Sequence, residues 1–207
     1  MGRKLAGKNL AGREAAPGHQ RLTPFEHILI GLLCGSSQSG YELKRYFATT
    51  PAVVYEPSSG ALYPALRRLA ARGLLHSELT TSSGGHEQHR YSPTQAGRET
   101  HRRWLRQPVD QTTVGRDLGV HLMRFAMAEG ELTPGETLAF LQDLGDALGQ
   151  FITDMETFMR DTPMPGRHAA LALEHGLAVH RASLLWVQHA CASLTESAGS
   201  GGAAPGS

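Results

Sequence analysis

The sequence predicts a mainly helical fold with one small β-hairpin: a winged helix-turn-helix domain followed by an all-helical dimerisation domain. Three observations lead to this prediction. Capping-box helix starts recur at three places, and a short β-hairpin with a glycine-rich tip follows the third predicted helix. The second half of the chain repeats apolar residues about every 3.5 positions. The chain has 207 residues, 40% of them hydrophobic, enough for one large or two small domains.

Three helix starts share the capping box, in which a hydroxyl accepts from the third helical N–H and a glutamate reaches back to the cap residue. They are Thr23-Pro-Phe-Glu26, Ser39-Gly-Tyr-Glu42 and Thr133-Pro-Gly-Glu136. In two of them proline stands at the first helical position, where no N–H is missed. They predict helices over residues 23–34 and 39–48 and a long helix from residue 133, with a short turn at 35–39.

The third helix is expected to begin with Ser58 or Ser59 as its N-cap, to run to Arg72 and to end at Gly73. Its apolar face consists of Leu62, Leu66 and Leu69, with Ala65 beside them. Residues of the other face are free to meet a partner. They are Ser59, Tyr63, Arg67 and, in part, Arg68.

Residues 74–81 and 87–92 read as the two strands of a hairpin, or wing, with glycines at its tip. Pro93 cannot donate to a strand ladder, so the second strand is expected to end by Ser92. Thr94 should cap a fourth helix that runs through Leu105 and is ended by Pro108.

The second half is predicted to be purely helical, with a short helix over residues 118–128 before the long one from residue 133. The last helix repeats apolar positions at steps of 4, 3, 4, 3 and 4: Leu173, Leu177, His180, Leu184, Val187 and Cys191. Such seams often pack two subunits, although an ordinary pair of helices within one chain gives the same pattern. The expected organisation is a disordered basic tail (1–21), the winged helix (22–107), the dimerisation domain (115–192) and a flexible tail (193–207).

Charge is divided unevenly along the chain. Residues 1–21 and 22–106 each carry a net charge of +4, whereas residues 107–207 carry −7. Only the first half is therefore expected to meet a polyanion. The longest apolar run, residues 28–34, is too short for a membrane span, and the first 21 residues have no apolar core of a secretory signal. Cys34 and Cys191 are expected to be free thiols in a reducing cytoplasm.

A winged helix binds double-stranded DNA by laying one helix in the major groove and its hairpin along the flanking backbone or minor groove. The third helix is the one expected to enter the major groove, because its apolar face packs in the core and its polar face carries Ser59, Tyr63 and Arg67. The candidate DNA-binding residues are Tyr41, Lys44 and Arg45 of the second helix, Ser58, Ser59, Tyr63, Arg67 and Arg68 of the third, and Gly85, His86, Gln88 and Arg90 of the wing.

Residues 28–105 resemble the PadR family of bacterial transcriptional regulators. The resemblance is carried by Ser39-Gly-Tyr-Glu-Leu-Lys44, Gly60-Ala-Leu-Tyr-Pro-Ala-Leu-Arg-Arg-Leu69, Gly73-Leu-Leu75 and Arg90-Tyr-Ser-Pro-Thr-Gln-Ala-Gly-Arg98. The second half is similar in layout to the larger subgroup, whose helical C-terminal domain dimerises. The resemblance implies a homodimeric, cytoplasmic repressor that binds a near-palindromic operator and is released by a ligand or stress signal. It also implies that Tyr63 lies at the DNA, that Pro64 shapes the first turns of its helix, and that Tyr41 is the matching aromatic of the second helix.

Other classes of function have weaker support. No nucleophile or phosphate-loop motif points to an enzyme, and no cofactor is expected. Eleven histidines suggest a metal- or pH-responsive sensor, but His86-Glu-Gln-His89 lacks metalloprotease spacing, and no metal site is expected. A winged helix that binds protein remains the further alternative. Trp104 and Trp186 are candidates for stacking on a small aromatic effector, although tryptophans in such positions are more often core residues.

Overall fold

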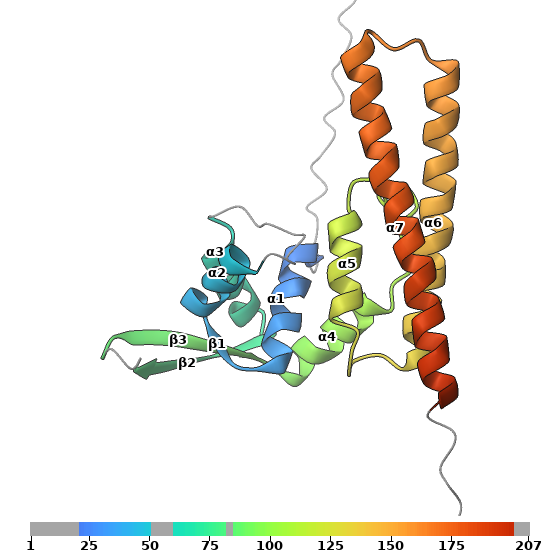
Figure 1. The fold of residues 1–207 in the computed structure, drawn as a ribbon. Helices are drawn as coiled ribbons and strands as arrows, with labels where there is room; N and C mark the ends of the chain where they lie inside the picture. Colours follow the sequence, from blue (N-terminus) through green and yellow to red (C-terminus); the bar gives the residue numbers. More distant parts are fainter. Residues whose placement is uncertain (1–20, 51–59, 82–84, 201–207) are drawn as a thin grey trace, which may run out of the picture.

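The structure is a computed structural model that describes residues 21–50, 60–81 and 85–200, with side chains described up to residue 196. Its elements are α1 (Pro24–Gly35), β1 (Gln38–Ser39), α2 (Gly40–Thr49), α3 (Leu62–Ala71), β2 (Leu75–Thr81), β3 (Glu87–Pro93), α4 (Gln95–Leu105), α5 (Leu118–Ala126), α6 (Pro134–Asp161) and α7 (Arg167–Ser200). Figure 1 shows a winged helix on one side of α5 and the long α6–α7 pair on the other. The predicted fold class is confirmed. None of the described helices is both long and apolar enough to cross a membrane.

The three predicted capping boxes are all present. Thr23, Ser39 and Thr133 each accept a hydrogen bond from the backbone N–H three residues later, at 3.2 Å in every case. The matching glutamates accept from the backbone N–H of the cap residues at 2.7–2.9 Å. These contacts are made within four consecutive residues, which is why the sequence alone placed the three helix starts correctly.

The sheet has a third strand that the sequence analysis missed. Residues 35–39 were expected to form a turn, but Gln38 and Ser39 pair antiparallel with Tyr91 and Arg90 of the wing. The strand order is β1-β3-β2. A strand of two residues has no periodicity to detect. Its position is set by β3, which lies between the other two strands.

The expected end of the second wing strand at Ser92 was wrong, because β3 continues to Pro93, which pairs with Leu75. The backbone N–H of Thr94 donates to the carbonyl of Leu74 at 3.0 Å. This bond flanks the Leu75–Pro93 pair and makes it a non-hydrogen-bonded pair of the ladder, in which the residue on β3 donates nothing. Proline is therefore accommodated at this position.

The start of α3 also differs from the prediction. Its first residue is Leu62, and Ala61 occupies the N-cap position without a side-chain cap. Ser58 and Ser59, the expected caps, lie outside the described residues. The predicted end is confirmed. Gly73 has a φ of +68°, and the N–H of Leu74 donates to the carbonyl of Leu69 at 3.0 Å, as in a glycine-terminated helix.

In the helical half, the predicted seam of α7 packs against α6 of the same chain. Leu177, His180 and Val187 are buried, and His180 bonds to the carbonyls of Gly176 and Gly115 at 2.7 and 3.1 Å. Of the two alternatives that the sequence allowed for this seam, the structure thus shows the helix pair within one chain. The tail predicted from residue 193 was wrong in its first part, because α7 continues to Ser200. Leu194, which lies in the additional helical segment, is partly buried against the core of this half.

A buried polar cluster joins the two halves of the molecule. The rings of His27 on α1 and Trp104 on α4 stack with centroids 4.9 Å apart and an interplanar angle of 1°. The guanidinium of Arg124, on α5, lies 5.7 Å from the Trp104 ring and 4.6 Å from the ring of Phe140 on α6. It donates hydrogen bonds to the carbonyl oxygens of Leu105, at 3.0 Å, and Gln107. It also lies 3.4 Å from Nδ1 of His121. One arginine thus holds α4, α5 and α6 together.

Burial keeps two histidines of this cluster neutral. Desolvation, reinforced by neighbouring positive charge, lowers the pKa of His27 to about 4 and that of His121 to about 4. A histidine whose pKa is lower in the folded chain binds its proton preferentially in the unfolded chain. Stability is therefore fully present above pH 6.5 and is lost as the pH falls from there toward 4.

We predict that the free energy of unfolding falls between pH 7 and pH 5, with a slope of up to about 1.4 kcal/mol per pH unit for each such histidine. Urea unfolding at pH 7, 6 and 5 measures it. His27→Phe keeps a ring on Trp104 but cannot take a proton, so its curve should be flatter than that of the wild type. Parallel curves would contradict the assignment of His27.

Candidate nucleic-acid interface

Helix α3 has one face in the core and one in solvent. Leu62, Leu66 and Leu69 are 5%, 0% and 0% exposed, whereas Tyr63 is 45% exposed and Arg67 is exposed as well. Tyr63 and Arg67 are four positions apart, so they stand one turn apart on the same side of the helix. The core contacts on one face therefore present this pair to solvent on the other.

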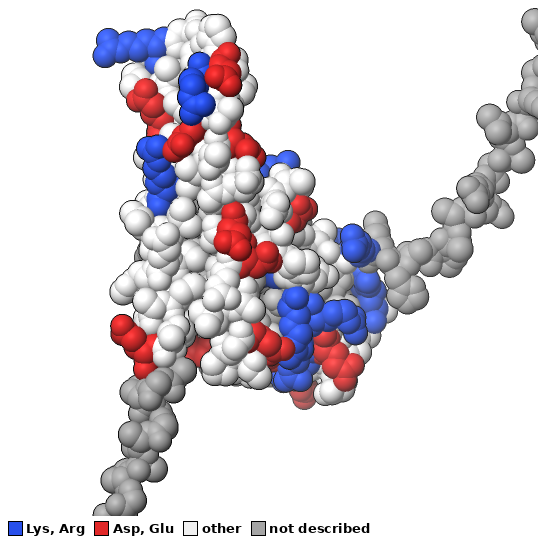
Figure 2. All heavy atoms as spheres, turned by 90° about the vertical axis from the view of Figure 1, so that its right-hand side faces the viewer, with Lys and Arg blue, Asp and Glu red and all other residues white. Residues whose placement is uncertain are grey.

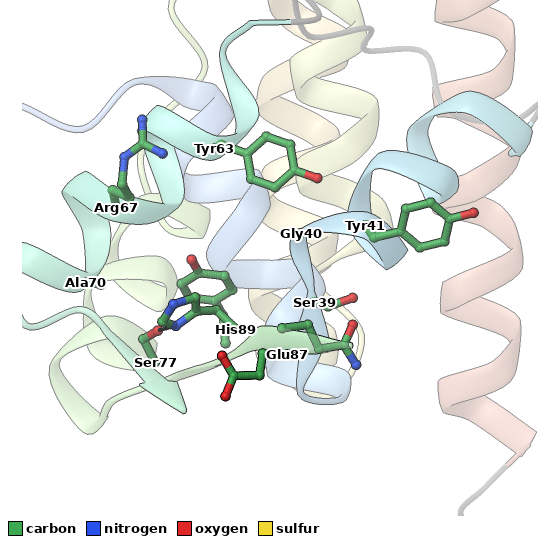
Figure 3. A pocket seen from close by; sticks show the side chains of 11 residues that line it. Ser39, Gly40, Tyr41, Tyr63, Arg67, Ala70, Ser77, Glu87 and His89 are labelled. Atoms are coloured by element: carbon green, nitrogen blue, oxygen red, sulfur yellow. Dashed lines mark hydrogen bonds between the residues drawn. The ribbon is translucent and has the colours of Figure 1, made fainter. Parts of the chain in front are cut away.

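A groove of about 590 Å³ runs between α3, the start of α2 and the wing. Figure 3 shows Tyr63 and Arg67 projecting from α3 at one side of it, and Ser77 and His89 facing each other from the two wing strands. The hydroxyl of Ser77 is 3.0 Å from Nδ1 of His89. The groove is thus bordered by an aromatic ring, a guanidinium and a hydrogen-bonded polar pair.

The place of the Tyr63 ring is set by a glycine. Gly40 opens α2, and a Cβ atom built on it would lie 2.5 Å from Cε1 of Tyr63 and 3.1 Å from its Cδ1. The bare backbone of Gly40 is therefore the surface on which the ring rests. The sequence Ser39-Gly-Tyr-Glu42 thus serves two ends, because Ser39 and Glu42 cap the helix while Gly40 makes room for Tyr63.

Two of the candidate arginines are held by carboxylates of the protein. Arg68 contacts Glu26 with both Nε and Nη2 at 3.0 Å. Burial raises the pKa of Glu26, but the hydrogen bonds from Thr23 and Arg68 lower it more, and the net pKa is below the usual value. Arg90 contacts Glu42 at 3.1 Å and also donates to the carbonyl of Ser37. These two contacts fix α3 to α1 and β3 to α2.

Of the remaining candidates that the structure describes, Tyr41 and Gln88 also line the groove, whereas Lys44, Arg45, Gly85 and His86 do not. Tyr41 is 66% exposed and projects from α2 away from Tyr63 (Figure 3). Lys44 and Arg45 are exposed on the same helix. Within the described part of the chain, the side chains of Lys44 and Arg45 form no ion pair. At the wing, Gly85, His86 and Gln88 follow the undescribed tip, and Gly85 has a φ of +79°, which suits glycine.

Sequence reasoning missed Ser77 and His89, although one signal was available. Gln88 and Arg90 were chosen as wing contacts, and side chains alternate between the faces of a strand. Tyr91 is the apolar residue of β3, buried in the core with α3. Period two puts His89 on the face of Tyr91, toward α3, and Arg90 on the opposite face.

The structure places the two candidate effector tryptophans in different clusters. Trp104 packs with Ile28, Leu105 and Met123. Trp186 lies edge-on to Phe125 with ring centroids 5.2 Å apart, in the core of the helical half. Among the described residues, the cleft that Trp104 lines does not include Trp186. Nor do those residues bring three His, Cys, Asp or Glu side chains together in a way that fits a metal ion.

A comparison with protein families finds a match within the first half of the chain. The PadR-like family of transcriptional regulators matches residues 29–103, from within α1 to near the end of α4. These residues form a PadR-like domain. The matched region contains α3, the wing and the groove between them, so the surface described above is the exposed face of a domain found in transcriptional regulators.

Solved structures related to this chain include PadR of Bacillus subtilis in complex with operator DNA. It has 19% sequence identity and a TM-score of 0.42, and the match covers 84% of this chain and 99% of that one. The same protein in complex with p-coumaric acid has 20% identity and a TM-score of 0.36, covering 84% and 99%. A PadR-like regulator of Bacillus cereus has 20% identity and a TM-score of 0.40, covering 85% and 98%. A search of curated proteins gave no match.

The packing of Tyr63 on Gly40 leads to a structural prediction. Gly40→Ala should move the Tyr63 ring, because the new methyl group would overlap the ring. The exposed ring can rotate or shift more easily than the backbone of α2 can. We expect shifted Tyr63 aromatic signals in NMR spectra and a stability change below about 1 kcal/mol. Gly35→Ala is the control, since a Cβ there meets nothing within 4 Å. Unchanged Tyr63 signals in Gly40→Ala would show that the ring does not rest on this glycine.

Proposed function

We propose that this chain regulates transcription by placing α3 in the major groove of double-stranded DNA, with the wing along the flanking backbone or minor groove. The observation that carries the proposal is the pair of Tyr63 and Arg67, displayed by a helix whose opposite face is in the core. Arginine can bond the O6 and N7 atoms of guanine through two N–H groups, and a tyrosine ring can pack against bases or sugars.

Two basic residues of α2, the helix that packs beside α3, suit a polyanion. Lys44 and Arg45 on α2 are exposed and free of ion pairs among the described residues, so their charges are available to phosphates. Arg68 and Arg90 have a different role in this proposal. Their bonds to Glu26 and Glu42 hold α3 and the wing in place for docking.

We further propose that two copies associate through α7. Its seam is occupied by α6, but the opposite face carries a second stripe at steps of 7, 4, 3 and 4, namely Leu171, Ala178, Ala182, Leu185 and His189. Leu171 and Leu185 are 49% and 66% exposed, respectively. Figure 2, which views the molecule from the side of the α6–α7 pair, shows acidic and basic side chains scattered over an otherwise uncharged surface of that pair. Steps of three and four are typical of helices that pair side by side.

A twofold dimer presents two recognition helices, and so the expected operator is near-palindromic. The regulator would act in the cytoplasm, where the DNA is, and repress until a small ligand or stress signal releases it. Operator DNA and p-coumaric acid are the ligands of the solved Bacillus subtilis PadR complexes. Trp104 is the better placed of the two candidate effector residues, because it lies at the junction of the two halves and lines a surface cleft.

Substitutions of Arg67 and Lys44 should have different effects. Arg67→Ala should weaken operator binding by about 1–3 kcal/mol and relax the sequence preference, because a base contact is lost. Lys44→Ala should weaken binding to all sequences to a similar degree and reduce the salt dependence, because a phosphate contact is lost. Fluorescence anisotropy at two salt concentrations, with operator and scrambled duplexes, distinguishes the two. If neither variant changes binding, the proposed docking is wrong.

The main test of the function is a gel-shift titration against the promoter region of its own gene, with the variant Tyr63→Ala/Arg67→Ala as the comparison. We expect a salt-sensitive shift that the double variant loses. A folded protein that shifts no DNA would instead favour a winged helix that binds another protein. A shift that depends on added metal ions or on pH would favour the sensor alternative.

The dimer is tested separately. Leu185→Glu puts a charge in the middle of the outer stripe of α7, whereas His168→Glu puts one on an exposed position in the first turn of the same helix. Analytical ultracentrifugation should show a dimer for the wild type and for His168→Glu, and a shift toward monomer for Leu185→Glu. Equal dimer formation by all three would place the subunit contact elsewhere.

A further inference from the structure

A second concave site lies on the winged helix, apart from the groove beside the wing. It is a cleft of about 430 Å³ between the start of α1, the end of α3 and one side of α4. The two sites have no lining residue in common. Arg21, Arg72 and Arg103 line the cleft, and His27 and Trp104 form part of its wall. Among the described residues, no aspartate or glutamate lines it.

Within the described part of the chain, the three arginines of the cleft have no partner of opposite charge. Their neighbours on the same helices do: Arg68 of α3 pairs with Glu26, and Arg102 of α4 pairs with Glu131 at 2.6 Å. Arg21, Arg72 and Arg103 are exposed and form no ion pair or side-chain hydrogen bond among the residues that the structure describes. Three like charges around one concave surface repel one another, and an anion in the cleft removes that repulsion.

The wall of the cleft adds an unused polar group. His27 is 8% exposed, and its Nδ1 atom is buried without a hydrogen-bond partner. Burial and the nearby charge of Arg72 lower the pKa of His27, so the ring is neutral at pH 7. It therefore adds no charge to the cleft, and a small turn of the ring lets it donate to or accept from a ligand.

Three guanidinium groups offer many N–H donors to one anion. A carboxylate has two oxygens, which one arginine can satisfy, whereas a phosphate group has three free oxygens and up to two negative charges. The volume is in the range of small-molecule sites, which begins at about 300 Å³. The chemistry thus matches a phosphate group attached to a small organic body, which would contact Thr100, Gln107 and the edge of Trp104.

We propose that this cleft is a binding site for a small organic phosphate, held by Arg21, Arg72 and Arg103. The position of the cleft gives it a regulatory use. Arg72 is the C-cap residue of α3, and Leu74 of the cleft precedes β2, so a bound phosphate links the end of the recognition helix to α1 and α4. That use depends on the proposed DNA-binding function, but the binding itself does not.

Isothermal titration calorimetry of the full chain with phenyl phosphate tests the site, with benzoate as a comparison at the same ionic strength. The variant Arg72→Gln/Arg103→Gln removes two charges of the cleft. The control, Arg160→Gln/Arg167→Gln, removes two exposed arginines from the far end of the α6–α7 pair. We expect the wild type and the control to bind phenyl phosphate more tightly than they bind benzoate. The cleft variant should bind phenyl phosphate at least about tenfold more weakly than the wild type does.

Arg72→Lys/Arg103→Lys keeps both charges but loses the planar forks, so its affinity should lie between those of the wild type and the glutamine variant. Circular dichroism verifies that each variant is folded. If phenyl phosphate fails to bind the wild type, or binds the glutamine variant equally well, the site does not exist. If the glutamine variant loses only operator affinity, its arginines serve the DNA backbone and the proposal is overturned.

The regulatory step has its own readout. Operator affinity measured with and without saturating phenyl phosphate should differ in the wild type and not in the glutamine variant. Equal affinities in the wild type would overturn the regulatory use and leave the calorimetric result standing. Calorimetry contains no DNA, so a failure of the proposed DNA binding would not change its outcome.

Discussion

The buried carboxylate of Glu26 makes the contact on which the position of α3 depends. It accepts from the N–H of Thr23 at 2.9 Å and from Arg68 at 3.0 Å, and Glu26 is only 3% exposed. Glu26 lies on α1, and the next turn of that helix is fully buried at Ile28, Leu29 and Ile30. Little water therefore reaches the Glu26 carboxylate to solvate its charge. A buried negative charge requires a partner, and here the partner is carried by α3. Helix α3 is thus fixed to the most buried helix of the domain.

The residue after Glu26 serves the other side of the molecule. Successive positions in a helix point about 100° apart, so Glu26 faces α3 while His27 faces α4, where it stacks on Trp104. Trp104 in turn lies under Arg124 of α5, whose guanidinium also covers Phe140 of α6. One turn of α1 therefore touches both α3 and the junction with the helical half. A change of packing at that junction has a short physical route to α3.

The features that the sequence revealed are those made by residues close together along the chain. A capping box needs four residues, and the two faces of α3 need only the helical period. The features that it did not reveal depend on distant partners. Arg68 and Arg67 are adjacent and chemically identical, and only the fold shows that Glu26, 42 residues before Arg68, pairs with Arg68. Strand β1 exists because β3 lies beside it, and Arg90 meets Glu42 across 48 residues.

The seam of α7 shows a different limit. A heptad-like stripe predicts that a helix packs along that face, but it does not say which helix it packs against. Helix α7 carries two such stripes on opposite faces. The fold resolves one of them, which packs on α6, and leaves the other open for the proposed second copy. Charge restricts how such a dimer could meet DNA. Residues 107–207 carry −7 and residues 22–106 carry +4, so a polyanion is repelled by the helical half and attracted by the winged helix. In the proposed dimer the acidic helices would thus join the subunits, while the basic winged helices face the DNA.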